Sequence, residues 1–342
     1  MPGARAGIRE GGWGRFLTVL VSFLFVPLTP LVRSFVPVQE TMLLFVPALA
    51  VCAILGWMAG GRLALAAFWT VLAAWILLHT GAPAHESYDR FARGWSFLVT
   101  GSFGLFCLLE APRTFLARAL LAVAVSLCIG TVTLLGTQGG ARVARALADD
   151  IVVRHQPVVD EWDRNRASGE TDATLRLFFP DNAVRAAVVE ASDTELREVP
   201  SVALRVFPAM LALESLAALA LAWSLYHRMS RTRIGAPLAP MRDFRFNDQL
   251  VWGLLAGVVA LLLPTLSSFR DVGVNLLVFF GALYVARGAG VLVWFLTPGH
   301  TVAMLAVGVA LVITGAFGAA FTFGLGLGDT WFDWRNRPRP TT

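Results

Sequence analysis

Two ionisable residues lie in the middle of long apolar stretches of this chain. Glu214 stands within PAMLALESLAALALAW, and Arg287 stands within FFGALYVARGAGVLVWF. A charge in apolar surroundings is costly, so such residues are candidates for function by default. The functional interpretation is a contact with a proton or a substrate carboxylate. The structural alternatives are an ion pair between the two residues, which would offset their desolvation, or an Arg287 side chain that extends to the membrane interface.

Two further polar residues precede Arg287 in the same apolar stretch. Asn275 is expected near the start of a helix, and Tyr284 follows nine residues later. Together with Glu214 and Arg287 they are the expected substrate-binding residues, lining a polar cavity between helices. The alternative is that Asn275 caps the helix and that Tyr284 is a buried ring with a bonded hydroxyl group.

The remaining reactive side chains give no catalytic or metal-binding pattern. The cysteines Cys52, Cys107 and Cys128 each lie inside an apolar run, without the spacing of a zinc site. The histidines are scattered, and His85 with its acidic neighbours is too weak a cluster for a metal. The paired acids at 149–150 and 161–163 indicate a solvated helix face. We therefore expect no enzymatic activity, no catalytic residue, no cofactor and no metal.

The composition points to the membrane. Of 342 residues, 56% are hydrophobic and only 15% are charged, with a mean hydropathy of +0.66. This excludes a soluble enzyme, a disordered protein and a small disulfide-rich fold. A spanning helix needs about 20 apolar residues. Nine segments approach that length: about 16–32, 42–59, 63–79, 92–109, 115–136, 204–226, 249–267, 273–297 and 301–325. The predicted fold is an all-α bundle of eight or nine transmembrane helices.

Arginines between the apolar segments predict the orientation in a bacterial inner membrane. Arg5, Arg9 and Arg15 place the N-terminus in the cytoplasm, and the basic loop 227–248 is the strongest cytoplasmic marker. Nine helices would put the C-terminal arginines outside. We therefore expect a cytoplasmic C-terminus, with one of the nine segments counted wrongly.

Residues 139–200 form the only sizeable polar segment. They contain 8 Arg and 12 Asp or Glu, a net charge of −4, and the orientation places them outside the cell membrane. A helix is expected over about 139–155, with Val143, Leu147 and Ile151 on one face, and another after Asp181 as N-cap. The predicted organisation is a helix block at 1–137, an amphipathic insert at 138–203 and a second helix block at 204–342.

The second half shows a more specific pattern. A proline-initiated helix (LRVFPAMLALESL) leads to a basic loop ending in PLAPMRDFRFNDQLVW, and then come GVNLLVFFGALYVARGAGVLVWF and GLGDTWFDWRNR. Over about 200–337 this resembles the uncharacterised bacterial membrane-protein family typified by YybS. The resemblance implies a distant likeness to S-components, the substrate-binding subunits of energy-coupling-factor transporters. It also implies a compact helical bundle that associates with a coupling subunit and ATPases. The number of helices and the acidic insert depart from a typical S-component.

Two functions follow as expectations. The first is a transport-related, S-component-like subunit that binds a small molecule. The second is a non-enzymatic scaffold or assembly partner acting through the insert and the basic loop, which predicts an apolar surface patch on the insert. Its partners would be cell-envelope proteins. In both cases the bilayer is a partner and nucleic acid is not. In the C-terminal segment, Asp329, Asp333 and Arg335 are candidates for an interface with a soluble partner; alternatively, this segment anchors the chain at the interface.

Overall fold

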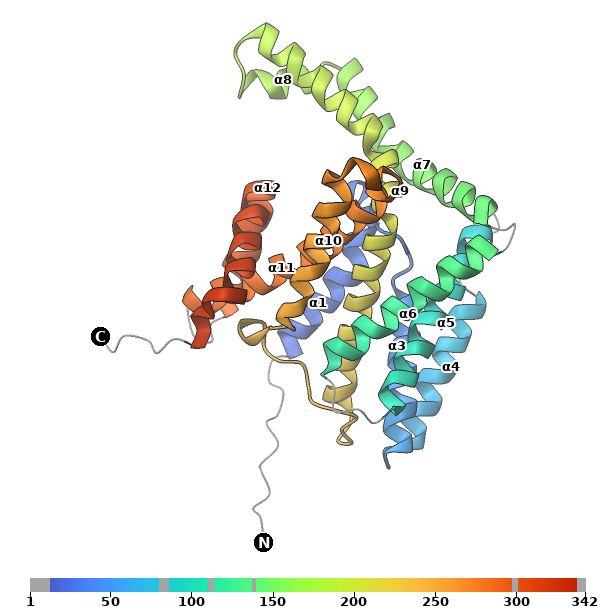
Figure 1. The fold of residues 1–342 in the computed structure, drawn as a ribbon. Helices are drawn as coiled ribbons and strands as arrows, with labels where there is room; N and C mark the ends of the chain where they lie inside the picture. Colours follow the sequence, from blue (N-terminus) through green and yellow to red (C-terminus); the bar gives the residue numbers. More distant parts are fainter. Residues whose placement is uncertain (1–12, 80–85, 110–113, 137–139, 297–300, 337–342) are drawn as a thin grey trace. The chain divides into compact units, whose positions relative to one another are not determined.

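The computed structural model describes residues 13–79, 86–109, 114–136, 140–296 and 301–336 (Figure 1). This part of the chain is helical and contains no strand, so the all-α prediction is confirmed. The chain divides into two compact units. Unit 1 comprises Met1–Phe207 and Glu214–Pro237, and unit 2 comprises Pro208–Leu213 and Leu238–Thr342.

The first segment of unit 1 is broken into short helical pieces at two prolines. It forms α1 (Trp13–Phe25), the short 3-10 helix η1 (Val26–Leu28) and α2 (Pro30–Arg33). Pro27 and Pro30 each stand at the start of a new helical piece, where a missing N–H is tolerated.

Long apolar helices make up most of the rest of unit 1. They are α3 (Met42–Met58), α4 (Leu63–His79), α5 (Glu86–Leu108) and α6 (Phe115–Gly136). Each agrees with a predicted apolar segment, although α5 begins six residues earlier than expected. Most residues of α3 are buried, whereas much of α4 faces outward with exposed apolar side chains, as in a helix that contacts lipid.

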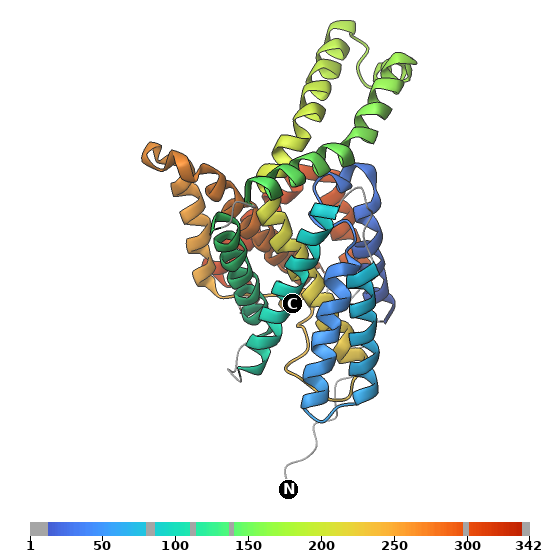
Figure 2. The ribbon, with the colours of Figure 1, turned by 90° about the vertical axis from the view of Figure 1, so that its right-hand side faces the viewer.

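The polar insert is a helical hairpin (Figure 2). Its arms are α7 (Gly140–Ala167) and the first part of α9 (Asn182–Met229), and the short α8 (Glu170–Arg176) lies near its end. Asp181 is the N-cap of α9, as predicted, and its carboxylate accepts the N–H of Ala183 at 2.7 Å. The domain boundary expected between residues 203 and 204 falls inside α9, because this helix continues from the insert into the apolar region without a break.

Apart from Pro208–Leu213 within α9, unit 2 consists of the chain from Leu238 onward. Two short 3-10 helices, η3 (Met241–Asp243) and η4 (Asp248–Leu250), lead into α10 (Val251–Leu262), η5 (Pro264–Phe269), α11 (Arg270–Leu296), α12 (Thr301–Phe332) and η6 (Trp334–Asn336). The helix α12 bends at Gly315, whose φ of 51° and ψ of −126° are accessible in practice only to glycine.

Among the described residues, four helices are long and apolar enough to cross a membrane: Tyr88–Leu108, Phe115–Leu134, Asn182–Met229 and Pro264–Phe295. Four shorter apolar helices are also present, at Trp13–Leu28, Met42–Met58, Leu63–His79 and Asp248–Leu262. The described part of the chain is thus that of a membrane protein with several apolar helices. The total of eight or nine spans stays a prediction.

Two glycines let α11 and α12 cross at backbone contact. A Cβ atom on Gly288 would lie 1.8 Å from the carbonyl oxygen of Thr322, and one on Gly326 would lie 2.0 Å from that of Tyr284. Small residues at such crossings are typical of membrane helices. The close crossing places Tyr284 and Arg287 of α11 next to the C-terminal part of α12, which carries Asp329.

We predict that Gly326→Ala destabilises unit 2 by roughly 1–3 kcal/mol, because the methyl group has no space against the backbone of α11. Gly324→Ala is the matched control, since its Cβ would meet nothing within 4 Å. Thermal unfolding in detergent compares the two variants. Equal stability of both would contradict the close crossing.

Candidate functional site

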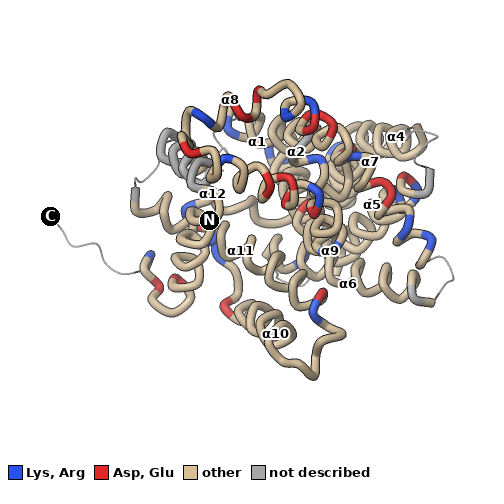
Figure 3. The backbone as a smooth tube through the Cα atoms, turned by 90° about the horizontal axis from the view of Figure 1, so that it is seen from above, with Lys and Arg blue, Asp and Glu red and all other residues tan. Residues whose placement is uncertain are grey.

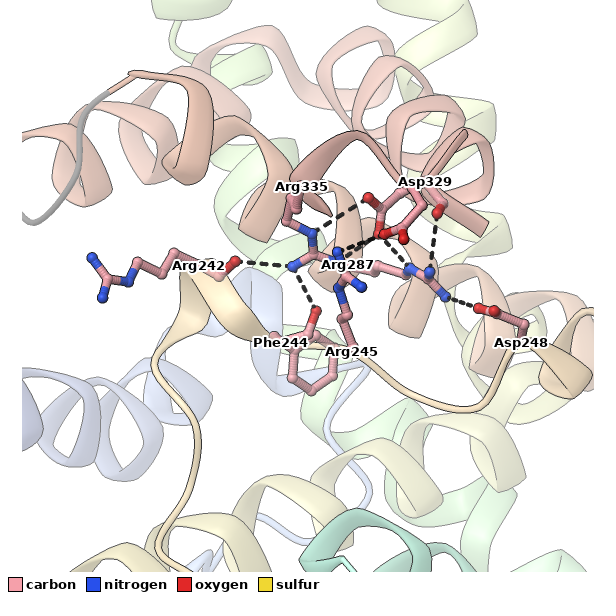
Figure 4. A network of polar contacts seen from close by, with 8 residues as sticks. Arg242, Phe244, Arg245, Asp248, Arg287, Asp329 and Arg335 are labelled. Atoms are coloured by element: carbon pink, nitrogen blue, oxygen red, sulfur yellow. Dashed lines mark hydrogen bonds and ion pairs between the residues drawn. The ribbon is translucent and has the colours of Figure 1, made fainter. Parts of the chain in front are cut away.

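Three arginine–aspartate pairs gather in unit 2 (Figure 4). At the centre, Asp329 of α12 accepts a hydrogen bond from Nε of Arg287 at 2.9 Å and one from Nη2 of Arg335 at 2.5 Å. The side chain of Asp329 is 0% exposed, and those of Arg287 and Arg335 are 3% and 4% exposed. We call the residues Arg245, Asp248, Arg287, Asp329, Asp333 and Arg335 the unit 2 cluster.

The outer members of this cluster come from the loop before α10. Asp248 binds Nη1 of Arg287 at 2.7 Å, and Arg245 pairs with Asp333 at 2.8 Å. Arg335 also donates to the carbonyl oxygens of Arg242 (2.9 Å) and Phe244 (3.0 Å). The three arginines thus meet three aspartates, so the cluster is neutral in charge and fastens the loop to the end of α12.

Aromatic rings cover the buried side of the cluster. The ring of Tyr284 is fully buried and meets Phe246 edge-on at 5.0 Å between centroids. The guanidinium group of Arg287 lies over the same Phe246 ring, 5.3 Å from its centroid, which is within the range of a cation–π contact. Phe246 therefore contacts both the ionic cluster and the buried ring of Tyr284.

A second set of buried polar groups lies in unit 1, where α7 meets the segment between α2 and α3. Arg154 of α7 is ion-paired with Asp150, donates to the carbonyl oxygen of Val36 at 2.5 Å and lies 4.5 Å above the ring of Tyr88. His155 bridges Ser34 Oγ (2.9 Å) and the carbonyl oxygen of Leu196 on α9 (2.8 Å). We call Asp150, Arg154, His155 and Glu214 the unit 1 cluster.

Glu214 contacts the same segment between α2 and α3 as Arg154 does, through a hydrogen bond of its own. Its Oε2 accepts the backbone N–H of Val38 at 3.0 Å, and the positive charge of Arg154 acts on it. Its Oε1 is buried and has no hydrogen-bond partner among the described residues. The cluster therefore holds two carboxylates and one guanidinium group where the insert begins.

Glu214 and Arg287, for which an ion pair was one alternative, each have other partners. All three guanidinium nitrogens of Arg287 are bound to Asp248 and Asp329 within unit 2, whereas Glu214 bonds to Val38 within unit 1. Each charge is compensated from its own unit. The sequence identified both residues as costly but not their partners.

The other predicted binding residues are also used in internal contacts. Asn275 lies in the second turn of α11, so it does not open the helix, and its Oδ1 accepts the N–H of Ala209 at 2.8 Å. Tyr284 is a buried ring, as the structural alternative expected, but its hydroxyl group has no hydrogen-bond partner among the described residues. A shared cavity lined by Glu214, Asn275, Tyr284 and Arg287 therefore stays a prediction without a supporting contact.

The three candidate interface residues differ in exposure. Asp333 has 48% of its side chain exposed, whereas Asp329 and Arg335 are buried inside the unit 2 cluster. The expected docking surface is therefore reduced to Asp333. Trp331, 65% exposed, fits the alternative of a C-terminal segment anchored at the membrane interface.

Sequence reasoning missed three buried residues of α7: Asp150, Arg154 and His155. Asp150 was expected on a solvated face, but only 4% of it is exposed. Its neighbour Asp149 is exposed, as expected. The missed signal was the position of Asp150 and Arg154 beside Ile151, on the face that Val143 and Leu147 mark as apolar. A charge pair spaced by four residues on an apolar face indicates a buried contact.

The end of the insert carries a different kind of surface. Leu177 is 81% exposed, Phe178 71% and Phe179 38%, and we call these three residues the apex. Arg185, itself nearly buried, holds this loop from inside. It donates to the carbonyl oxygens of Phe179 (3.0 Å) and Pro180 (2.7 Å) and pairs with Asp172 at 2.9 Å.

Residues 181–330, less than half of the chain, match the family model described as Predicted membrane protein (DUF2232). This agrees with the apolar helices in identifying a membrane protein similar to a family of unknown function. No curated protein and no solved structure matches the chain. The narrower likeness to the YybS family and to S-components stays a prediction.

The ion pairs near the apex predict a dependence on pH. The pKa of Asp172 lies below its usual range, first because Arg185 hydrogen-bonds to its carboxylate and then because Arg176 lies close by. A lowered pKa stabilises the folded apex above the unfolded-state value of about 4. This stabilisation is lost as the pH falls through the folded-state value.

A spin label at the exposed Thr174 should therefore gain mobility as the pH falls from 6 to below 3. The Asp172→Asn variant should be mobile throughout and show no such step, while Glu170→Gln, the control, should keep it. A label whose mobility is unchanged in the unmodified protein would contradict the role of Asp172.

Proposed function

We propose that this membrane protein is a non-enzymatic scaffold whose insert binds another protein of the cell envelope. The observation that carries the proposal is the apex, three consecutive large apolar residues exposed at the end of an acidic hairpin. Exposed apolar patches on polar surfaces mark interaction sites, and aromatic residues are enriched at the centres of protein interfaces.

The apex is supported by a hairpin with many cross-contacts. Trp162 of α7 donates to Asp193 of α9 at 3.3 Å, and Arg197 pairs with Asp163 at 3.3 Å across the two arms. At the base, Arg154 and His155 connect α7 to the segment between α2 and α3 and to α9. A binding surface that is already ordered loses less conformational entropy on association, which favours a docking role.

The position of the apex favours a protein over the surrounding bilayer. The α9 residues between Asn182 and Leu204 form about 33 Å of helix at 1.5 Å per residue, so the apex stands well away from the apolar part of α9. Figure 3 marks the positions of charged residues along the backbone near α8, and the hairpin is net acidic in sequence. The complementary partner has an apolar pocket with basic groups at its rim.

A transport-related role is the second candidate, and one observation favours it. The unpartnered Oε1 of Glu214 is a buried acceptor that a proton or a small ligand could satisfy. In that case the partners would be a coupling subunit and ATPases rather than a protein bound at the apex.

The test is purification from the native host in mild detergent, with quantitative mass spectrometry of co-purifying proteins. We predict that Leu177→Ser/Phe178→Ser lowers recovery of one envelope protein at least about tenfold, as expected for a central interface contact. Val152→Ser/Val153→Ser, which changes two exposed apolar residues on α7, is the control and should keep the partner.

Recovery of ATPases in a fixed ratio, unaffected by either pair of substitutions, would contradict the scaffold and support transport. The scaffold proposal would also be contradicted if the apex substitutions changed the recovered amount of no co-purifying protein.

A further inference from the structure

Three exposed arginines meet at the end of unit 1 opposite the insert. Arg62 lies in the turn between α3 and α4, and Arg231 and Arg233 lie in the loop that follows α9. In Figures 1 and 2 this turn and the end of α9 share the lower end of the unit. The orientation predicted from the sequence makes this the cytoplasmic end.

Buried aromatic side chains of α9 fix the course of the loop. The Tyr226 hydroxyl group donates to the carbonyl oxygen of Thr232 at 2.9 Å, and the Trp223 indole N–H donates to that of Ala236 at 3.0 Å. The His227 ring lies 3.1 Å from the carbonyl oxygen of Gly235. Because these rings are buried, residues 231–236 are held against the end of the helix bundle rather than left as a free linker.

The same contacts bring the loop to the α3–α4 turn. A Cβ on Gly61 would lie 3.3 Å from Oγ1 of Thr232, so the turn and the loop touch at this point. Arg62 follows Gly61 directly, and Arg231 and Arg233 flank Thr232. Three guanidinium groups therefore project from backbone positions that are adjacent in space.

The surroundings place these arginines at the level of the lipid headgroups. Trp57 is 46% exposed, Met58 61% and Leu63 59%, and all three border the same turn. A tryptophan with apolar neighbours next to arginine is typical of the boundary between acyl chains and headgroups.

No acidic residue offsets the three charges locally. The contributing segments, 41–85 and 215–242, contain no Asp or Glu in the sequence. Within the described residues, Arg62, Arg231 and Arg233 form no ion pair, in contrast to the arginines of both clusters above. A compact set of unneutralised guanidinium groups attracts multivalent oxyanions and can bind phosphate in a bidentate manner.

We propose that Arg62, Arg231 and Arg233 form a binding site for the phosphate group of an anionic phospholipid in the adjacent leaflet. The aromatic anchors of α9 hold the site in shape, and the apolar residues of the α3–α4 turn contact the acyl chains. This site is independent of the apex and does not rest on the proposed scaffold function.

The test uses the full chain in detergent, titrated with short-chain phosphatidylglycerol and followed by native mass spectrometry. Each arginine near a membrane surface contributes about a fivefold gain in affinity for anionic lipid. Arg62→Gln/Arg231→Gln/Arg233→Gln should therefore weaken binding at least about tenfold. Arg142→Gln/Arg145→Gln/Arg164→Gln, with the same charge change on exposed positions of α7, should leave it unchanged.

Two further probes identify the source of the phosphate. Phosphatidylcholine should bind weakly and equally to all variants. If inorganic phosphate binds as tightly as phosphatidylglycerol, or if both triple variants lose lipid equally, the lipid site is contradicted. Thermal unfolding without lipid checks that the variants fold. Should the triple variant fail this check, the three single substitutions are measured, each with an expected weakening of about fivefold, and no weakening in any of them overturns the proposal.

Discussion

A charge withdrawn from water has to meet its opposite charge inside the same apolar surroundings, and this requirement organises much of unit 2. The central residue is Asp329, whose carboxylate forms ion pairs with Arg287 of α11 and with Arg335 after α12. The two arginines in turn fix the loop before α10 through Asp248 and two carbonyl oxygens. The loop and the C-terminal segment consequently share one end of unit 2. That this end is cytoplasmic stays a prediction.

The same requirement is met in unit 1 by different residues. Arg154 is buried where the insert begins, and it is held by Asp150, by a carbonyl oxygen and by the ring of Tyr88. These contacts make the base of the insert part of the folded unit, and α9 continues from it as one helix. A fixed base and cross-linked arms give the exposed apex a defined position, which is what a docking element needs. The exposed arginines at the opposite end differ because they have no acid nearby.

The helices were predictable from the sequence because length and hydrophobicity define them locally. The limits of α4 and α6 and the Asp181 cap follow from patterns within a few residues. The cost of burying Glu214 and Arg287 was equally visible. Their partners were not, because Val38, Asp248 and Asp329 are 39 to 176 residues away and only the tertiary fold selects them. The sequence did not predict that α9 is continuous, because its composition changes from polar to apolar along its length. The backbone hydrogen bonds of a helix do not depend on that change, so the helix runs through it.

The most direct test of the central claim is a double-mutant cycle on Asp329 and Arg335, measured as the free energy of unfolding in one detergent. Asp329→Leu leaves two buried arginines poorly compensated and should cost about 3–5 kcal/mol. Adding Arg335→Met removes one of these arginines, and Arg287 keeps its ion pair with Asp248. The double variant should therefore lose less free energy of unfolding than the two single variants lose together, by more than about 1 kcal/mol. The exposed pair of Arg245 and Asp333 is the control and should show a coupling below about 1 kcal/mol. If the losses at Asp329 and Arg335 instead add to within about 0.5 kcal/mol, the two charges do not depend on each other and the account is contradicted.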